Sequence, residues 1–338
     1  MQTLRWGIIG CGDVTEVKSG PAFQRCDGSG LVAVMRRDGK RAEDYARRHE
    51  VRRWYDDADK LIADPEVDAV YIATPPGAHL DYALRVAAAG KPCYVEKPMA
   101  RSHAECVKMT EAFDRARVPL FVAYYRRALP RFVKAKETID SGRLGRITGC
   151  RYRLTRVHNP APSQVWRLDA AESGGGLFLD IGSHVLDLLD HLLGEFVEYS
   201  GTASTSGTLP VEDRVAVNFR TSAGVVGAAS WNFAGSVDEE RLEIDGTEAR
   251  LSMEVIGHGP LKVTRGSEQV ETIALADPPH VQQPLIQSVV DELLGRGTCP
   301  SSGRSGARAS AVMDAALNSF YAGRQDEFWA RPGTWRRC

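Results

Sequence analysis

The fold is decided by the stretch Trp6-Gly7-Ile8-Ile9-Gly10-Cys11-Gly12-Asp13-Val14-Thr15. The apolar run from Leu4 to Ile9 predicts a buried strand, and a Gly-x-Gly pair follows it directly. In a strand–turn–helix unit of this kind, the first glycine permits a tight turn and the second lets the backbone approach a pyrophosphate. Thr15 stands where the full pattern has a third glycine. The stretch predicts a dinucleotide-binding turn, and a turn without a ligand is the alternative.

The rest of the first third alternates between short apolar runs and helical patterns. Further strands are predicted at Leu31–Met35, Ala69–Ala73, Cys93–Val95 and Leu120–Ala123. Helices are predicted between them at Gly39–His49, His79–Ala89 and His103–Ala116. This alternation is typical of βαβ units, which build a parallel sheet covered on both faces.

Beyond about residue 123 the segments become longer and richer in β-branched and aromatic residues, which predicts antiparallel strands. These strands are expected at Ile147–Val157, Arg214–Thr221, Val225–Phe233, Leu242–Asp245 and Leu261–Arg265. Helices are expected at Pro130–Ser141, Leu179–Leu193, Pro284–Leu294 and Gly306–Tyr321. The predicted fold is therefore α/β plus α+β: a Rossmann dinucleotide-binding domain over 1–123, then an α+β domain with a large, mainly antiparallel open-faced sheet over 124–338.

Composition excludes several classes of protein. The 338 residues carry 43 Lys plus Arg and 44 Asp plus Glu, and this balance argues against nucleic-acid binding. A hydrophobic content of 43% argues against disorder. Seven scattered cysteines without a Cys-x-x-Cys pair fit neither a disulfide framework nor a zinc ribbon. Without a secretory signal or an 18-residue apolar run, we expect a cytoplasmic protein that does not enter a membrane.

The end of the second predicted strand bears on the choice of dinucleotide. Folds that bind NAD often place Asp or Glu there, where the carboxylate binds the ribose 2′-hydroxyl. This chain has Arg36 and Arg37 instead, and a guanidinium pairs well with a 2′-phosphate. The position favours NADP over NAD. A solvated basic loop is one alternative, and Asp38 serving the ribose of NAD is another.

Two further segments carry residues suited to proton transfer. Lys97, in Glu96-Lys97-Pro98, follows a predicted parallel strand at the edge where open α/β sheets bind ligands. Burial there lowers the pKa of a lysine toward neutrality, and a plain surface lysine is the alternative. After Gly174-Gly175-Gly176, the residues Asp180, His184 and Asp187 share one face of the predicted helix. A histidine between carboxylates suits a general acid/base, and the alternative is an N-terminal Asp that stabilises the helix beside a surface histidine. The pattern does not fit a zinc site, so no metal is expected.

Together these motifs resemble those of the Gfo/Idh/MocA oxidoreductases, the glucose–fructose oxidoreductase and inositol dehydrogenase family. The resemblance covers nearly the whole chain. It is carried by Gly10-Cys11-Gly12, Thr74-Pro75-Pro76-Gly77-Ala78-His79, Glu96-Lys97-Pro98, Tyr125-Arg126-Arg127, Trp166-Arg167, and Gly174-Gly175-Gly176 through Asp180 and His184. Two positions depart from the usual pattern: Pro76 is often Asn in the family, and Arg36 is commonly Asp.

The resemblance implies a role for each matching residue. Lys97, His184 and Asp180 are the expected catalytic residues, with Asp180 orienting the substrate or His184. Expected cofactor contacts are Gly10, Cys11, Gly12, Asp13, Val14, Arg36, Arg37, Thr74, Pro75, His79, Glu96 and Lys97. Expected substrate contacts are Tyr125, Arg126, Trp166, Arg167, Asp180 and His184, with His158 and Asn159 as further polar residues of the pocket. The second domain is expected to bind substrate and to form homodimers or homotetramers through its open sheet.

The expected activity is reversible hydride transfer between a nicotinamide cofactor and a secondary alcohol or carbonyl of a sugar, an inositol or a similar cyclic polyol. Three alternatives stay open. One is a glycoside-cleaving relative that oxidises C3 transiently and keeps its NAD. The second is a dihydrodiol or imine-type reductase with an apolar substrate. The third is a regulator that binds the dinucleotide without turnover, against which the intact set of acid/base residues argues.

Overall fold

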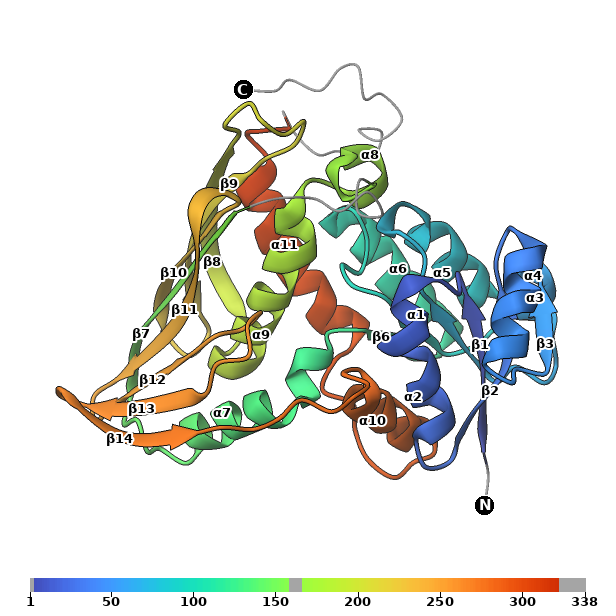
Figure 1. Ribbon diagram of the computed structural model, residues 1–338, viewed down its shortest axis with the longest axis horizontal. Coiled ribbons are helices and arrows are strands. Elements are labelled where there is room, and N and C mark those ends of the chain that lie inside the picture. Colours follow the sequence, from blue (N-terminus) through green and yellow to red (C-terminus); the bar gives the residue numbers. More distant parts are fainter. Residues whose placement is uncertain (1–2, 158–165, 322–338) are drawn as a thin grey trace. The chain divides into compact units, whose positions relative to one another are not determined.

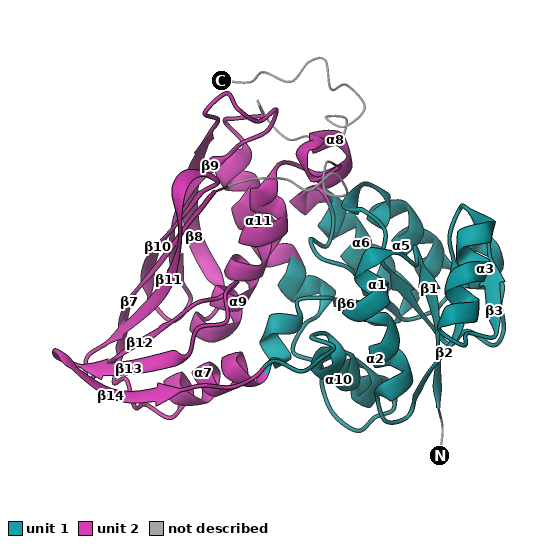
Figure 2. Ribbon diagram, in the orientation of Figure 1, with its two compact units in different colours: residues 1–100, 105–129, 277–306 teal, residues 101–104, 130–276, 307–338 magenta. Residues whose placement is uncertain are grey.

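The structure, a computed structural model, describes residues 3–157 and 166–321. The chain forms two compact units, shown in different colours in Figure 2. Unit 1 takes the described residues of 1–100, 105–129 and 277–306, and unit 2 takes those of 101–104, 130–276 and 307–338. The sequence-based division at residue 123 treats the first domain as one continuous stretch. The return of 277–306 to unit 1 is a feature that the sequence patterns do not indicate.

Unit 1 is built on a parallel sheet of six strands, sheet A, in the order β3-β2-β1-β4-β5-β6 (Figure 1). The strands are β1 Leu4–Ile9, β2 Ser29–Met35, β3 Arg53–Tyr55, β4 Ala69–Ile72, β5 Cys93–Val95 and β6 Leu120–Val122. This order is that of a dinucleotide-binding Rossmann fold, in which ligands bind at the carboxyl ends of the strands. The predicted fold class of the first domain is confirmed. Only the short edge strand β3 has no counterpart among the predicted strands.

The helices of unit 1 connect and cover these strands. They are α1 Asp13–Val17, α2 Gly20–Arg25, α3 Gly39–Arg48, α4 Ala58–Ala63, α5 His79–Ala88, α6 His103–Ala116, whose first two residues belong to unit 2, and α10 Gln283–Leu293. Short 3₁₀ turns lie at Pro76–Ala78 and Tyr125–Ala128. Every residue of β4 and β5 is buried, as expected for strands covered on both faces.

Aromatic rings fill the interior of unit 1 behind the glycine turn. The ring of Phe23 lies 4.8 Å from that of Trp6 and 5.2 Å from that of Tyr71, and Tyr71 stacks on Tyr94 at 5.1 Å. All four side chains are fully buried. Burial of such rings contributes about 1.5–3 kcal/mol each, so this cluster holds α2 firmly against β1, β4 and β5.

Unit 2 is built on sheet B, eight strands in the order β14-β13-β12-β11-β7-β10-β9-β8. They are β7 Ile147–Val157, β8 Phe196–Ser204, β9 Arg214–Thr221, β10 Val226–Asn232, β11 Ala234–Gly246, β12 Arg250–Met253, β13 Leu261–Arg265 and β14 Glu268–Ile273. Neighbours within this sheet run antiparallel except β7 and β10, which run parallel. The predicted second fold, with a mainly antiparallel sheet, is confirmed.

The helices associated with unit 2 are α7 Pro130–Asp140, α8 Ala170–Ser173, α9 Ser183–Leu193 and α11 Gly303–Leu317, the last of which begins in unit 1. Figure 1 shows α9 and α11 running along one side of sheet B. On that side β9 buries its alternate residues, among them Val215, Val217 and Phe219. The other face carries rows of charged residues such as Arg151, which pairs across the strands with Glu243 at 3.4 Å. One face of sheet B is thus core, and the other stays open.

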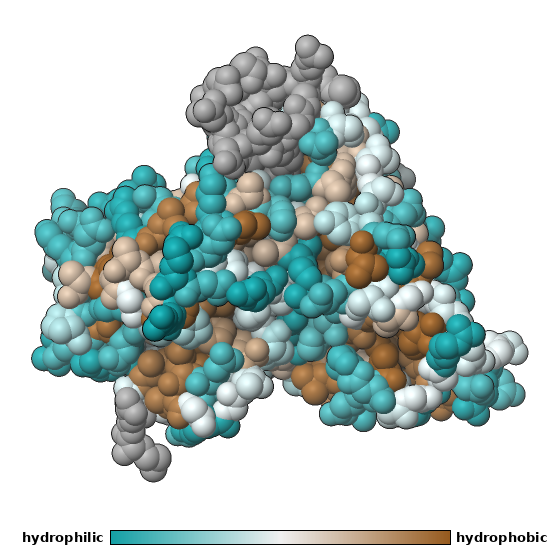
Figure 3. Space-filling model, turned by 180° about the vertical axis from the view of Figure 1, so that it is seen from behind, coloured by the Kyte–Doolittle hydropathy of each residue, from teal (hydrophilic) through white to brown (hydrophobic). Residues whose placement is uncertain are grey.

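The surface seen in Figure 3 mixes hydrophilic and hydrophobic side chains. No helix within 3–157 and 166–321 has the length and apolarity needed to cross a membrane. The six cysteines in these ranges, for example the buried Cys11, are all free thiols.

Candidate functional site

The turn after β1 has the backbone that a bound pyrophosphate requires. Gly10 has φ +90°, and a Cβ there would lie 2.7 Å from the methyl group of Thr74. Its N–H donates to the carbonyl of Met35 at 2.8 Å, which ties the turn to β2. The position of Gly12 is open, because the nearest atom to a Cβ would be the Gly10 oxygen at 3.8 Å. The turn therefore leaves room beside the first turn of α1, where the leading N–H groups lack partners within the helix.

Thr15, which replaces the third glycine, closes this turn. Its hydroxyl donates to the carbonyl of Gly12 at 2.8 Å and accepts the Gly12 N–H at 3.0 Å. The hydroxyl of Tyr45 in turn donates to the carbonyl of Thr15 at 2.8 Å. A Cβ at Gly20 would overlap both the Thr15 carbonyl and the Tyr45 hydroxyl. Gly20 therefore allows the close packing for which the full pattern uses its third glycine.

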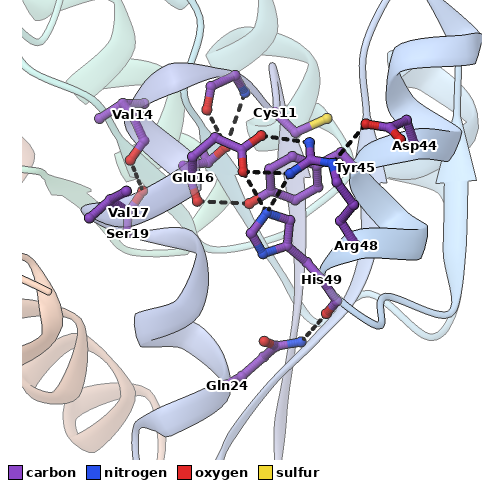
Figure 4. Close-up of polar contacts among 12 residues, drawn as sticks. Cys11, Val14, Glu16, Val17, Ser19, Gln24, Asp44, Tyr45, Arg48 and His49 are labelled. Atoms are coloured by element: carbon purple, nitrogen blue, oxygen red, sulfur yellow. Dashed lines mark hydrogen bonds and ion pairs between the residues drawn. The ribbon is translucent and has the colours of Figure 1, made fainter.

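An ionic cluster holds α1 to α3 (Figure 4). Arg48 donates to both carboxylate oxygens of Glu16, at 2.8 and 2.9 Å, and His49 Nε2 lies 2.7 Å from Glu16 Oε2. The ring of His49 stacks on Tyr45 at 4.1 Å. Hydrogen bonding by Arg48 lowers the pKa of Glu16 to about 2. Beside this cluster, burial raises the pKa of the Cys11 thiol to about 11, so Cys11 is a protonated packing residue.

The end of β2 carries the two arginines that the sequence singled out. Arg36 is half-buried, and its Nη1 donates to the carbonyl of Cys11 at 3.3 Å, so the guanidinium lies against the glycine turn. Arg37 is exposed. Asp38 accepts the backbone N–H of Arg41 at 3.3 Å and caps α3. The Asp38 carboxylate thus serves as a helix cap, and its side chain is 53% exposed.

The Thr74–His79 segment follows β4 at the same edge of sheet A. The Thr74 hydroxyl oxygen is buried and has no hydrogen-bond partner among the described residues, although its methyl group packs on Gly10. A buried hydroxyl with this environment fits a cofactor group as partner. Together with the open space over Gly12, it makes the donor set of unit 1 compatible with a dinucleotide. Pro75, next to Thr74, is half-buried.

His79, one of the expected cofactor contacts, lies inside unit 1. Its ring is fully buried, with Nε2 2.7 Å from the carbonyl of Thr74 and Nδ1 3.2 Å from those of Pro98 and Met99. Burial lowers the pKa of His79. Both ring nitrogens face main-chain carbonyls of unit 1. The side chain joins the turn after β4 to the turn after β5.

The Glu96-Lys97-Pro98 turn follows β5, as the sequence predicts. The Lys97–Pro98 peptide bond is cis, and Lys97 is half-buried. Glu96 is buried and accepts three hydrogen bonds: from Tyr71 and Gln282 at 2.6 Å each, and from the N–H of Lys97 at 3.0 Å. The carboxylate therefore points into unit 1.

The remaining predicted residue pair of unit 1 lies in the 3₁₀ turn after β6. Arg126 Nη1 donates to the Tyr125 hydroxyl at 3.1 Å, and its guanidinium carbon lies 5.1 Å from the centre of the Tyr125 ring. Both side chains are more than nine-tenths buried. The two side chains pack on each other, and the Arg126 guanidinium meets the Tyr125 hydroxyl.

In unit 2 three of the predicted substrate contacts lie together: Trp166, Arg167 and Asp180. Arg167 Nε donates to Asp180 Oδ2 at 3.0 Å, and the guanidinium stacks over the ring of Trp166 at 4.6 Å. The side chains of Arg167 and Asp180 are 25% and 26% exposed, so a ligand can reach both. The pair places guanidinium donors beside carboxylate acceptors.

The helix that carries Asp180 and His184 does not begin as a regular α-helix. Residues Phe178–Gly182 form a π-turn, and α9 starts only at Ser183. The ring of Phe178 lies where a Cβ on Gly182 would be, so the glycine permits the wide turn. The predicted shared face assumed 3.6 residues per turn and does not apply across this segment. His184 and Asp187 are buried, whereas Asp180 remains accessible. Single π-turns of this kind recur at functional sites.

Glu212 is a residue that the sequence analysis missed. It is fully buried and accepts the N–H of Gly176 at 2.7 Å and the hydroxyl of Tyr321 at 2.5 Å. A Cβ on Gly176 would lie 2.7 Å from the Glu212 carbonyl, and Gly174, with φ +90°, packs against Arg101. Gly176 thus allows the loop to lie against the Glu212 backbone, and Gly174 allows it to approach Arg101. Nothing in the local sequence around Glu212 indicates this contact.

Within the described ranges no cluster of three or more His, Cys, Asp or Glu side chains is arranged to hold a metal ion. The predicted pocket residues His158 and Asn159 lie outside those ranges.

Comparison with known proteins agrees with this architecture. One family model, described as an oxidoreductase family with an NAD-binding Rossmann fold, matches residues 4–124. Another, the GFO/IDH/MocA C-terminal domain, matches residues 132–252. The chain is 37% identical over 315 residues to Oxidoreductase P35 of Formosa agariphila, across 92% of this chain and 97% of the relative.

Two named enzymes are also similar. The 1,5-anhydro-D-fructose reductase of Ensifer adhaerens is 29% identical over 329 residues, across 96% of this chain and 98% of that enzyme. A levoglucosan dehydrogenase solved with NADH and levoglucosan has a TM-score of 0.83 at 24% identity, across 94% and 97% of the two chains, which shows a shared fold. Since the two family models match both parts of the chain and together span most of it, the chain belongs to the GFO/IDH/MocA family of oxidoreductases, whose first domain is an NAD-binding Rossmann fold.

Proposed function

We propose that the protein is an NAD(P)-dependent dehydrogenase or reductase acting on a secondary alcohol or carbonyl of a sugar, an inositol or a related cyclic polyol. The observation that carries the substrate class is the Arg167–Asp180 pair, an accessible carboxylate and guanidinium fixed by their mutual contact at 3.0 Å. Such a pair offers acceptors and donors side by side, which suits neighbouring hydroxyl groups. The names of two similar enzymes, a 1,5-anhydro-D-fructose reductase and a levoglucosan dehydrogenase, agree with this class.

Three residues carry the proposed chemistry. A nicotinamide ring, when bound, accepts or supplies the hydride. During oxidation, the neutral form of either Lys97 or His184 accepts the single hydroxyl proton. During reduction, the protonated form returns that proton, and its positive charge stabilises the negative charge that develops on the oxygen. Asp180, held by Arg167, orients the substrate or His184. Because Lys97 belongs to unit 1 and the other residues to unit 2, their convergence on one substrate is part of the proposal.

The dinucleotide is proposed to bind along the glycine turn, with Gly10, Cys11, Gly12, Asp13 and Val14 against the pyrophosphate. Thr74 and Pro75 contact it from the next turn. Glu96 and His79 act indirectly, because their polar atoms are engaged within unit 1. We propose NADP as the preferred form, since Arg36 and Arg37 follow β2 while Asp38 caps α3.

Two further properties belong to the proposal. The open face of sheet B forms a homodimer or homotetramer, supported by exposed apolar side chains such as Val226 and Val157 on that face. A cytoplasmic location agrees with the free cysteines of the described ranges.

The deciding experiment is a screen of oxidation and reduction. Levoglucosan, 1,5-anhydro-D-fructose, inositols and common aldoses are each assayed with NAD(H) and NADP(H) by absorbance at the nicotinamide band. The best substrate is then tested with Lys97→Ala and with Lys134→Ala, a control whose ammonium pairs with Glu137 on the exposed side of α7. We expect Lys97→Ala to lose roughly 10²–10⁴-fold in kcat and the control to stay within twofold. Retention of kcat within about tenfold in Lys97→Ala contradicts the assigned role.

A further inference from the structure

A buried chain of hydrogen bonds in unit 1 ends at the catalytic turn. It begins at Gln282, the residue before α10, whose side chain is 1% exposed. Gln282 Nε2 donates to Glu96 Oε1 at 2.6 Å, and its Oε1 accepts from the Tyr94 hydroxyl at 3.0 Å. Glu96 Oε2 accepts the backbone N–H of Lys97 at 3.0 Å. The Gln282 amide is thus connected to the backbone of Lys97 through the Glu96 carboxylate.

The orientation of this amide is fixed by its partners. A carboxylate only accepts, so the nitrogen of Gln282 must face Glu96. Burial raises the pKa of Tyr94 well above its usual value, so the phenol keeps its proton and donates to the amide oxygen. The same holds for Tyr71, which donates to Glu96 Oε1 at 2.6 Å. Each donor and acceptor in the chain therefore has one compatible arrangement.

The segment that supplies Gln282 is itself anchored at the end of α1. The N–H of Gln282 donates to the carbonyl of Lys18 at 3.3 Å, and His280 Nδ1 lies 2.6 Å from the carbonyl of Val17. The Tyr71 hydroxyl oxygen also lies 3.2 Å from Ser19 Oγ. These contacts connect the end of α1, whose start faces the proposed pyrophosphate position, to the Glu96 carboxylate.

We propose that Gln282 is a positioning residue for Lys97. By donating to Glu96 it fixes the carboxylate against the Lys97 N–H, and this fixes the backbone from which the catalytic ammonium group projects. The inference rests on the proposed function, because it takes Lys97 as the acid/base. It adds a residue from the far end of the sequence, and a dependence of Lys97 on the 280–282 segment, that neither the motifs nor the family resemblance indicates.

The test compares Gln282→Leu with Gln287→Leu. Gln287 lies on α10 and hydrogen-bonds to Asp27 at 2.8 and 3.2 Å, so its variant loses similar bonds without touching Glu96. For Gln282→Leu we expect kcat to fall at least tenfold, while the Kd of the dinucleotide, from its fluorescence, stays within threefold. Gln287→Leu is expected to keep kcat within twofold. A loss of kcat that is equal in both variants, or that follows the melting temperature alone, overturns the proposal.

Tyr71→Phe provides a second route to the same contact, because it removes one donor to Glu96 and keeps the ring. It is expected to lower kcat severalfold in the same direction, and it decides the matter if Gln282→Leu does not fold. Unchanged kcat in a folded Tyr71→Phe would then overturn the proposal.

A readout without turnover separates this inference from the proposed activity. Reductive methylation followed by mass spectrometry gives the labelling rate of Lys97 relative to the surface residue Lys134. Gln282→Leu is expected to change that ratio at least threefold, and Gln287→Leu to leave it unchanged. If the ratio shifts but no panel compound is turned over, the positioning role stands and the proposed activity fails. If turnover depends on Lys97 but neither kcat nor the ratio responds to Gln282→Leu, the positioning role fails alone.

Discussion

Arg167 and Asp180, thirteen positions apart, meet through one hydrogen bond of 3.0 Å between Nε and Oδ2 while Arg167 stacks on Trp166. The pair is accessible, and it connects the segment before α8 to the π-turn that precedes His184. Neither residue is locked by deep burial. The bond helps to orient both side chains, which makes the pair sensitive to small changes in geometry.

Arg167→Lys is therefore expected to raise the KM for the best polyol about tenfold, because an ammonium group cannot both stack on Trp166 and donate along the same direction. The Kd of the dinucleotide is expected to stay within twofold. The matched control is Arg304→Lys, which alters the exposed Arg304–Asp114 pair at 2.6 Å in unit 1. Steady-state kinetics check the prediction, and an unchanged KM would remove Arg167 from the substrate site.

Gly10→Ala is expected to weaken dinucleotide binding at least tenfold and to destabilise the protein by roughly 2 kcal/mol or more, since it combines an unfavourable backbone with an overlap. The new Cβ would lie 2.7 Å from Thr74 Cγ2. Gly90→Ala separates the two effects, because Gly90 has φ +67° and no atom within 4 Å of the added carbon. Calorimetry should show a larger loss of stability in Gly10→Ala than in Gly90→Ala, and fluorescence titration should show a larger loss of dinucleotide affinity. Equal losses of stability and affinity in the two variants would contradict the prediction, because the overlap with Thr74 would then have no effect.

Arg36→Ala is expected to reduce kcat/KM with NADP at least tenfold and to leave kcat/KM with NAD within threefold, because a 2′-phosphate would lose a cationic partner. Arg47→Ala is a suitable control, since this exposed arginine on α3 pairs with Asp44. Stronger activity of the unaltered protein with NAD than with NADP would contradict the proposed preference.

Glu16→Gln tests the cluster of Figure 4 through pH. The pKa of Glu16 in the folded protein, about 2, lies below that of an unfolded glutamate. Its ionised form therefore stabilises the fold above roughly pH 4.5, and this stabilisation is lost as pH falls toward 2. Because the side chain is about one-third exposed, we expect only about 1 kcal/mol at pH 7. Urea unfolding should show the two proteins converging between pH 4.5 and pH 2, and a constant difference would contradict the prediction.

Tyr321→Phe removes the hydroxyl that donates to buried Glu212 at 2.5 Å. Loss of a hydrogen bond to a buried carboxylate is expected to cost about 2 kcal/mol, seen as a lower melting temperature. Tyr199→Phe on β8, where the tyrosine is 39% exposed, should change the melting temperature little. If both variants melt alike, Glu212 is satisfied without Tyr321.

Much of the fold could be predicted because its signals are local. The strand Cys93–Val95 and the helix His103–Ala116 were predicted with the bounds that the structure gives them, since apolar runs and helical spacing mark both. The strand β3 has only three residues, and β8 exposes most of its side chains, so neither has an apolar pattern to detect. The π-turn depends on how Phe178 packs on Gly182, which spacing alone does not indicate.

The candidate site also contains residues that local motifs indicate and residues that they do not. Motif residues such as Lys97 could be located because they follow a recognisable strand. The residues that support these motifs could not be located from the sequence, because they lie far away along the chain. Glu212 contacts Gly176 from 36 positions away, and Gln282 contacts Glu96 from 186 positions away. Contacts of this kind arise only once the chain has folded.

The late return of 277–306 to unit 1 also sets an order of events during synthesis. Ser301 donates to the carbonyl of Val122 from 179 positions downstream, and Ser302 forms a bridge with Phe121 on the edge strand β6. A nascent chain that has left the ribosome only as far as β6 therefore lacks both the cover for that edge and the amide that orients Glu96. Lys97 emerges early in translation, but its surroundings are completed only after residues 277–306 have been made.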